Sequence, residues 1–282
     1  MTELNLFDQL IRELECNQPT SHLIDTINKT KPLGLSYSHI YHSIRASKVI
    51  GGFNGRRVLE MGGALPDEYV FNTLKASRWV AVEYHEYIGN EYKCNHNVNY
   101  SYDYTGWEGF HAKWKATNGQ CFNVVYSIAA FEHIHNLSGC LESIHEMLYD
   151  GGLLYAYFTP IWSAPNGSHG FHPKEIEDLG NHCHLFFDFS SIYDHLVDQH
   201  GYEKKSACSA AHKLYYNYQI NRYSYEEYLK IFEASVFKEK QVIPIGLAPF
   251  ESLYLGDKLE RIKIFHPQMK ISCAGFEVVM RK

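Results

Sequence analysis

Short apolar runs recur along the middle of the chain, at residues 57–60, 79–83, 122–126 and 153–158. Runs of this kind, bounded by glycine and polar residues, predict buried β-strands. A segment with helical periodicity, residues 137–148, separates two of them. Because strands that alternate with helices pair in parallel through right-handed crossovers, the pattern predicts a doubly wound α/β sheet with helices on both faces.

Helical patterns also flank this region. Leu6, Leu10 and Leu14 would share one face of a first helix, and a second pattern covers residues 36–50. We therefore expect a helical extension over residues 1–50, followed by one main domain over residues 51–282. Further patterns predict helices at 67–74, 190–200 and 224–232 and a final strand at 271–280.

Tyrosines gather between residues 212 and 228, in the part of the chain that we place between the sixth and seventh strands. Residues 209–250 are therefore expected to form a helical, Tyr-rich cap insertion over a substrate. Ordinary packing of a helical pair is an equally open interpretation, because tyrosine is often half-buried.

Composition limits the class of partner. The formal net charge is -6 and no basic block occurs, which argues against a nucleic-acid substrate. The chain has no apolar run long enough for membrane insertion and no signal-peptide pattern, so we expect a cytoplasmic protein. Its 7 cysteines form no Cys-x-x-Cys pair and are expected to be reduced.

The abundance of Tyr, Phe and His suits a pocket for a small polar molecule or sugar, although an aromatic-rich core is as good an interpretation. Whether the chain forms a homodimer stays open.

The strongest chemical signal is a glycine turn after the first strand. Glu60 is followed by Gly62-Gly63-Ala64, and glycine lets a backbone pass close to a bound nucleotide at the carboxyl end of a strand. Glu83 ends the next strand, where a carboxylate can accept both hydroxyls of a ribose. A nicotinamide dinucleotide is disfavoured, because Ala64 and Asp67 stand where that fingerprint needs glycines.

In this region the chain resembles the class I S-adenosylmethionine-dependent methyltransferases. The resemblance covers about residues 55–160 and rests on residues 58–63, Val82-Glu83, 123–134 and the Gly151-Gly152 turn within 145–154. It implies a Rossmann-like, mostly parallel seven-stranded sheet and S-adenosyl-L-methionine as the cofactor. Glu60, Gly62 and Gly63 would surround its methionyl part, Glu83 its ribose, and Asp103 or Tyr104 its adenine. The neighbouring positions Ala64, Tyr84 and Ser127 complete the expected binding set.

Candidate bases follow the fourth and fifth strands, where acceptor sites lie in such folds. An alcohol acceptor needs a base for its proton, and histidine suits that task. The preferred candidates are His169 and His172, in a loop rich in Gly, Pro and Asn after the fifth strand, and His133 is the competing choice. We expect no metal, although a divalent ion is an alternative that would use the following group: His169, His172, His182 and His184 with Glu175 or Asp178.

These features predict a methyltransferase acting on a small polar molecule, with O-methylation of a hydroxylated metabolite or sugar as the preferred reaction. N-methylation remains an alternative. A noncatalytic cofactor-binding subunit is another, because Ala64 and Pro66 replace later glycines of the family turn.

Overall fold

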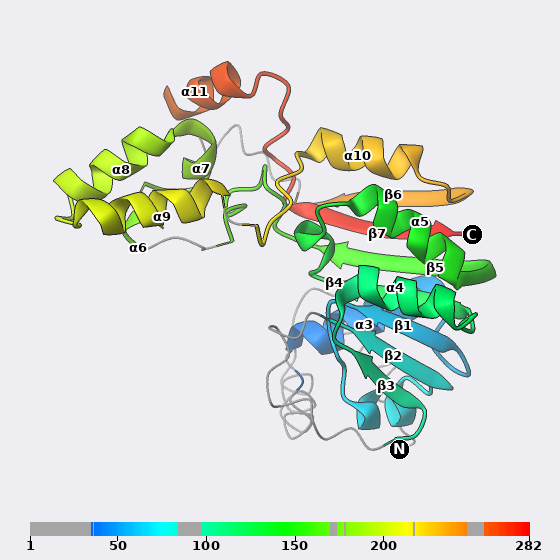
Figure 1. Cartoon of the computed structure of the whole chain (residues 1–282). Coiled ribbons are helices and arrows are strands. Elements are labelled where there is room, and N and C mark those ends of the chain that lie inside the picture. Colours follow the sequence, from blue (N-terminus) through cyan, green and yellow to red (C-terminus); the bar gives the residue numbers. More distant parts are fainter. Residues whose placement is uncertain are drawn as a thin grey trace, which may run out of the picture.

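The computed structural model describes residue 35 and residues 37–83, 97–169, 174–177, 179–216, 218–246 and 257–282. A seven-stranded sheet in the order β3-β2-β1-β4-β5-β7-β6 is its centre (Figure 1). In chain order its strands are β1 (Arg57–Met61), β2 (Arg78–Val82), β3 (Tyr100–Asp103), β4 (Phe122–Ile128), β5 (Leu148–Phe158), β6 (Glu239–Ile245) and β7 (Gly275–Arg281).

Strand order reverses beside β1. β2 and β4 both pair with β1 in parallel, with Met61 opposite Val82 on one side and opposite Ser127 on the other. Loops that leave neighbouring strands in opposite directions open a crevice at the carboxyl ends of those strands, where ligands of open α/β sheets bind. β7 runs antiparallel to both β5 and β6, so the sheet is mostly parallel, as the sequence predicts.

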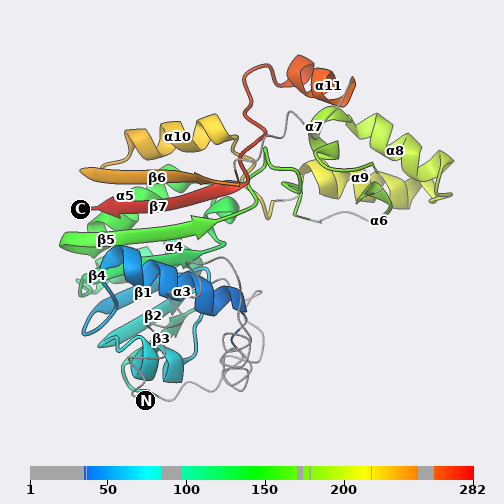
Figure 2. The ribbon, with the colours of Figure 1, turned by 180° about the vertical axis from the view of Figure 1, so that it is seen from behind.

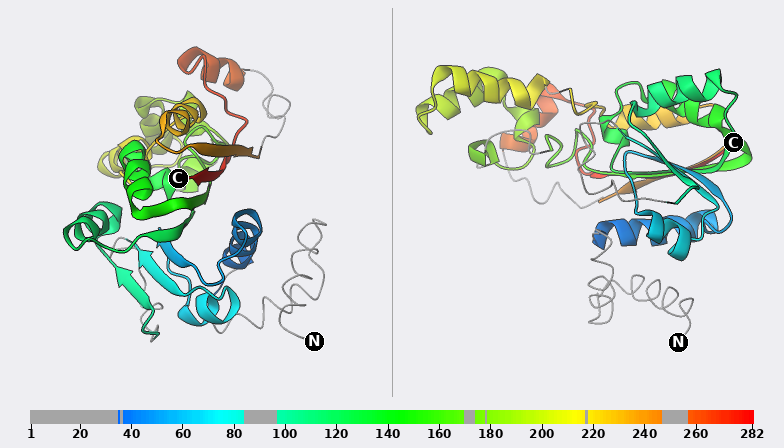
Figure 3. Two further views of the ribbon diagram at one scale, coloured as in Figure 1. Left: turned by 90° about the vertical axis from the view of Figure 1, so that its right-hand side faces the viewer. Right: turned by 60° about the horizontal axis from the view of Figure 1, so that its bottom comes forward.

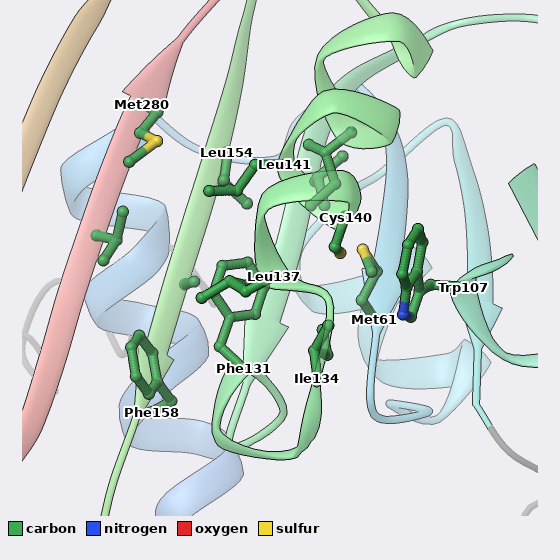
Figure 4. Close-up of a cluster of buried hydrophobic side chains, with 14 of the residues drawn as sticks. Met61, Trp107, Phe131, Ile134, Leu137, Cys140, Leu141, Leu154, Phe158 and Met280 are labelled. Carbon is green, nitrogen blue, oxygen red and sulfur yellow. The ribbon is translucent and has the colours of Figure 1, made fainter. Parts of the chain in front are cut away.

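Helices cover both faces of the sheet (Figure 3). One face carries α3 (Tyr37–Ile50) and the short π-helix η2 (Tyr69–Thr73), and the other carries α4 (Gly106–Ala116), α5 (Leu137–Met147) and α10 (Tyr225–Ala234). Successive side chains of β1 point to opposite faces of the sheet and so contribute to the hydrophobic core on each face. Val58 packs on the α3 side, whereas Leu59 and Met61 pack on the α5 side. Figure 4 shows the α5 side, where Met61 lies beside Trp107 and Cys140.

A second group of helices extends beyond the carboxyl ends of the parallel strands (Figure 2). It contains α6 (Lys174–Glu177), α7 (Cys183–Phe186), α8 (Phe189–Asp198), α9 (Lys204–Tyr216) and α11 (Asp257–Phe265). These helices, called the lobe below, share an apolar cluster of their own that includes Phe186, Leu196 and Leu214. No helix in the described ranges is long and apolar enough to cross a membrane.

The lobe differs from the cap expected at residues 209–250. Its helices lie mainly between β5 and β6, and α11 between β6 and β7. The expected cap range contains β6, a strand of the sheet, and α10, which packs Tyr228 and Phe232 into the sheet core. The Tyr-rich segment therefore precedes the sixth strand instead of following it. The helix expected around Leu6–Leu14 lies outside the described residues.

Candidate active site

A cavity of about 170 Å³ opens at the carboxyl ends of β1, β2 and β4. Three of the residues that the sequence predicts as site residues line it: Gly62, Glu83 and His133. The other lining residues are Met61, Val82, Gly106, Trp107, Ala129, Ala130 and Ile134. The strand order brings these segments together, because β1 lies between β2 and β4.

Gly62 is the first residue of the turn after β1. Its φ of +77° lies in the left-handed region, and a Cβ at this position would lie 2.2 Å from Cβ of Ala130 in the loop after β4. Its backbone N–H donates to the Val82 carbonyl at 3.0 Å. Only glycine therefore lets the loops after β1, β2 and β4 come this close.

Glu60 does not line the cavity. Its buried carboxylate accepts hydrogen bonds from Trp79 Nε1 at 2.6 Å and from the Leu65 backbone N–H at 2.9 Å. A Cβ on Gly63 would lie 2.9 Å from Glu60 Oε1, so the second glycine makes room for this carboxyl. Burial raises the pKa of Glu60 to about 7. Glu60, Gly63 and the buried Ala64 thus shape the turn that carries Gly62.

Glu83 lies half-buried directly after β2 and lines the cavity together with Ala130. Its backbone is fixed on both sides, because its N–H donates to the Asp103 carbonyl at 3.0 Å and its carbonyl accepts from Gly106 N at 3.4 Å. Of the described residues that line the cavity, Glu83 is the one acid. Met61, Val82, Trp107 and Ile134 make the surrounding wall apolar, and Figure 4 shows three of them close together.

Three further residues predicted to bind the cofactor, Asp103, Tyr104 and Ser127, are described and lie outside this lining. Asp103 forms an ion pair with Lys113 at 2.8 Å and accepts from the Thr105 N–H at 2.9 Å, which fixes the start of α4. Tyr104 is 42% exposed and stacks on Tyr102. Ser127 is buried and donates to the Met61 carbonyl at 3.0 Å, a contact that joins β4 to β1. Tyr84 lies outside the described residues.

His133 projects from the 3-10 helix η5 (Phe131–His133) after β4 and has an exposed side chain. Its Nδ1 is hydrogen-bonded to the Gln219 carbonyl. Because a carbonyl can only accept, Nδ1 carries the hydrogen and Nε2 carries the lone pair of the neutral ring. Desolvation by the surrounding protein lowers the pKa of His133, and the Gln219 carbonyl offsets part of this effect. The ring is therefore neutral near pH 7, with a basic nitrogen available for a proton.

His169 lies next to His133. The two ring centroids are 5.2 Å apart at an interplanar angle of 74°. His169 Nε2 donates to the Pro160 carbonyl at 2.7 Å, and burial lowers the pKa of His169 to about 4. Its backbone has a φ of +56°, which is unusual for a residue with a side chain. His172, the third candidate, lies outside the described residues.

The alternative metal ligands do not converge among the residues whose placement is described. His184 Nε2 donates to the Trp162 carbonyl at 2.7 Å and His182 Nε2 to the Ile271 carbonyl at 3.3 Å, and their ring centroids are 6.4 Å apart. Within the described ranges, no three His, Cys, Asp or Glu side chains could hold an ion together.

Sequence reasoning missed Gly106 and Trp107 as lining residues. They begin α4 directly after β3, and Gly106 has a φ of +67°. β3 is short and its residues Tyr100–Asp103 show no apolar run, so the strand that positions Gly106 could not be identified. The Gly-Trp pair was the available signal, because glycine often marks a position of positive φ.

Solved structures share the fold of this chain. A Listeria monocytogenes protein assigned to the S-adenosylmethionine-dependent methyltransferases matches 86% of this chain and 97% of its own at 16% identity, with a TM-score of 0.50. The chain has the methyltransferase fold. A mycolic acid cyclopropane synthase solved with S-adenosylhomocysteine matches 87% of this chain and 84% of its own, also at 16% identity and a TM-score of 0.50. No protein-family model and no curated protein matches the sequence.

Proposed function

We propose that this chain is an S-adenosyl-L-methionine-dependent methyltransferase with its cofactor in the cavity beside Gly62 and Glu83. The observation that carries the proposal is the position of this cavity at the strand-order reversal, in a sheet that has the methyltransferase topology. Of the two structural neighbours described above, one is assigned to the S-adenosylmethionine-dependent methyltransferases and the other was solved with S-adenosylhomocysteine bound.

The lining fits the chemical groups of this cofactor. The half-buried Glu83 carboxylate can accept from two vicinal ribose hydroxyls, and the apolar side chains of Met61, Val82 and Trp107 can contact the adenine ring. Gly62 lines the cavity without a side chain, and we assign the methionyl part to its side of the cavity. When bound, the cofactor supplies an electrophilic methyl group on a sulfonium. We assign Glu60, whose carboxyl is held by Leu65 and Trp79, to shaping the turn.

We propose a small polar acceptor, preferably the hydroxyl group of a metabolite or sugar, and His133 as its base. His133 lines the cavity, and its Nε2 holds a lone pair in the neutral ring. His133 would take the hydroxyl proton while the cavity aligns the oxygen for in-line displacement. His169 is the weaker candidate, because a base with a pKa of about 4 has little affinity for that proton.

An amine acceptor is the alternative that the same site would serve with less help from a base. A noncatalytic subunit would bind the cofactor and transfer nothing. A cytoplasmic location and a homodimer stay predictions from the sequence.

Binding and turnover tests separate these functions. Calorimetry should show micromolar-range binding of S-adenosylhomocysteine and no binding of nicotinamide dinucleotides. A screen of pooled hydroxylated and amino metabolites should then find an acceptor that releases S-adenosylhomocysteine. Tighter binding of a dinucleotide would reject the proposal, and cofactor binding with no turnover on any pool would favour the noncatalytic subunit.

A further inference from the structure

A short segment, residues 218–223, lies across the loop after β4 and is called the strap below. The strap connects the end of α9 in the lobe with the start of α10 on the sheet. Its Gln219 and Tyr218 carbonyls accept hydrogen bonds from the rings of His133 and His135, respectively. In return, the Tyr223 hydroxyl donates to the His135 carbonyl. The strap and the loop that carries His133 therefore hold each other.

Asn221 is the centre of this contact. Its side-chain amide donates to the carbonyls of Phe131 at 2.7 Å and Ile134 at 3.0 Å, on either side of His133. Its backbone N–H donates to the Glu132 carbonyl at 2.9 Å. Three donors of one residue thus bind three carbonyls of a single turn, and no other residue type presents the same amide in this geometry.

The side-chain oxygen of Asn221 accepts two hydrogen bonds, one from α10 and one from within the strap. Its Oδ1 accepts from the Tyr228 hydroxyl at 2.8 Å and from the Tyr223 backbone N–H at 3.2 Å. Tyr228 is completely buried on α10 in the core of the sheet. The amide is therefore fixed in orientation, with its NH2 group toward the His133 loop and its oxygen toward α10.

This arrangement determines which nitrogen of His133 is basic. The Gln219 carbonyl lies two residues before Asn221, so its place opposite His133 Nδ1 depends on the anchoring of the strap. With that carbonyl in place, Nδ1 must donate, and Nε2 is left with the lone pair. A solvated neutral imidazole instead favours the hydrogen on Nε2, which would leave the nitrogen that a base needs already protonated.

We propose that Asn221 is a positioning residue, which anchors the strap to the loop after β4 and thereby holds His133 in the Nδ1–H form with a basic Nε2. The inference rests on the proposed function only in taking His133 as the base.

The state of His133 can be read without an acceptor. Long-range 1H–15N correlation spectra of protein labelled with 15N-histidine, at pH 7.5, distinguish the two neutral forms, and loss of a signal in His133→Gln assigns it. We expect the Nδ1–H form in the unmodified protein. Asn221→Asp, which places a carboxylate against two carbonyls, should convert most of the His133 population to the Nε2–H form.

Two further variants make the test specific. Asn123→Asp is the matched control: Asn123 accepts from the Arg57 backbone N–H at the far end of β4, a role that a carboxylate keeps, so His133 should not change. If Asn221→Asp fails to fold, Tyr228→Phe removes a single hydrogen bond from Asn221 and should shift His133 in the same direction to a smaller extent. An Nε2–H form in the unmodified protein, or an unchanged His133 in a folded Asn221→Asp or Tyr228→Phe variant, would overturn the proposal.

Cofactor binding separates this proposal from the proposed function. Asn221→Asp should retain binding of S-adenosylhomocysteine, because Gly62 and Glu83 lie on other loops, although the loop that Asn221 holds also lines the cavity through Ala130, His133 and Ile134. Loss of the Nδ1–H form with cofactor binding intact supports a positioning role. A protein that holds His133 as described but binds no S-adenosylhomocysteine would reject the proposed function and leave the role of Asn221 in place.

Discussion

His133 and His169 face each other across two loops, with ring centroids 5.2 Å apart, and each donates a hydrogen to a backbone carbonyl through a different nitrogen. Nδ1 of His133 and Nε2 of His169 are the donors, so the lone pairs of the neutral rings lie on opposite kinds of nitrogen. Both pKa values are lowered by desolvation, that of His169 to about 4. The pair is therefore uncharged at neutral pH, and only His133 lines the cavity.

Replacement of His133 by Gln should lower turnover about 10²–10⁴-fold with the acceptor found by the screen, and leave the affinity for S-adenosylhomocysteine nearly unchanged. Because the base must be deprotonated, activity should be complete above the pKa of His133 and fall as the pH drops through it. This fall in activity should occur below pH 6.5, because the pKa of His133 is lowered from its ordinary value of 6.5. Steady-state kinetics against pH checks both expectations.

His169→Gln and His200→Gln are the comparison variants for this measurement. His200 is exposed after α8 and should tolerate the change. A larger loss in His169→Gln than in His133→Gln would move the base to the loop after β5, where His172 would then also need testing.

Glu83→Ala should weaken binding of S-adenosylhomocysteine by roughly 1.5–3 kcal/mol, because it removes charge-assisted hydrogen bonds to the ribose. Calorimetry on the folded variant measures the change. Glu142→Ala on α5 removes an exposed carboxylate of the same type and should leave affinity unaltered. Equal affinities for the two variants would place the ribose away from β2.

The periodic parts of the sequence predicted the fold well. Buried strands such as β1 and β4 are short apolar runs, and the glycine turn and Glu83 mark the ends of β1 and β2. Glu60 shows the limit of this reasoning: it adjoins the turn in sequence, but alternation along β1 puts it on the α3 side with Trp79, away from the cavity lining. The contacts of His133 with Gln219 and of Gly62 with Ala130 join distant segments, and no local pattern encodes them.

Gly62→Ala should destabilise the protein by about 1–3 kcal/mol and impair binding of S-adenosylhomocysteine, because the new Cβ would overlap Ala130. Gly151→Ala is the control for backbone strain alone. Gly151 has a similar φ of +79° but nothing within 4 Å of the added Cβ. Chemical denaturation should show a smaller loss for Gly151→Ala and calorimetry an unchanged affinity. Equal effects of the two variants would mean that the loops after β1 and β4 do not need the close approach.

The buried carboxyl of Glu60 should make stability depend on pH. Its pKa is about 7 in the folded protein against an ordinary value of 4.5, so the folded state holds the proton more tightly than the unfolded chain. Stability from this group is therefore complete below about pH 4.5 and is lost as the pH rises to about 7 and beyond. The difference between the two pKa values corresponds to a loss in unfolding free energy on the order of 3 kcal/mol.

Glu60→Gln keeps an oxygen that can accept from Leu65 and Trp79 but cannot ionise, so its unfolding free energy should lack this pH-dependent contribution. Urea denaturation of both proteins between pH 4.5 and pH 8 should show the advantage of Glu60→Gln growing with pH, whereas a constant difference would mean that Glu60 ionises in the folded state near its ordinary pKa.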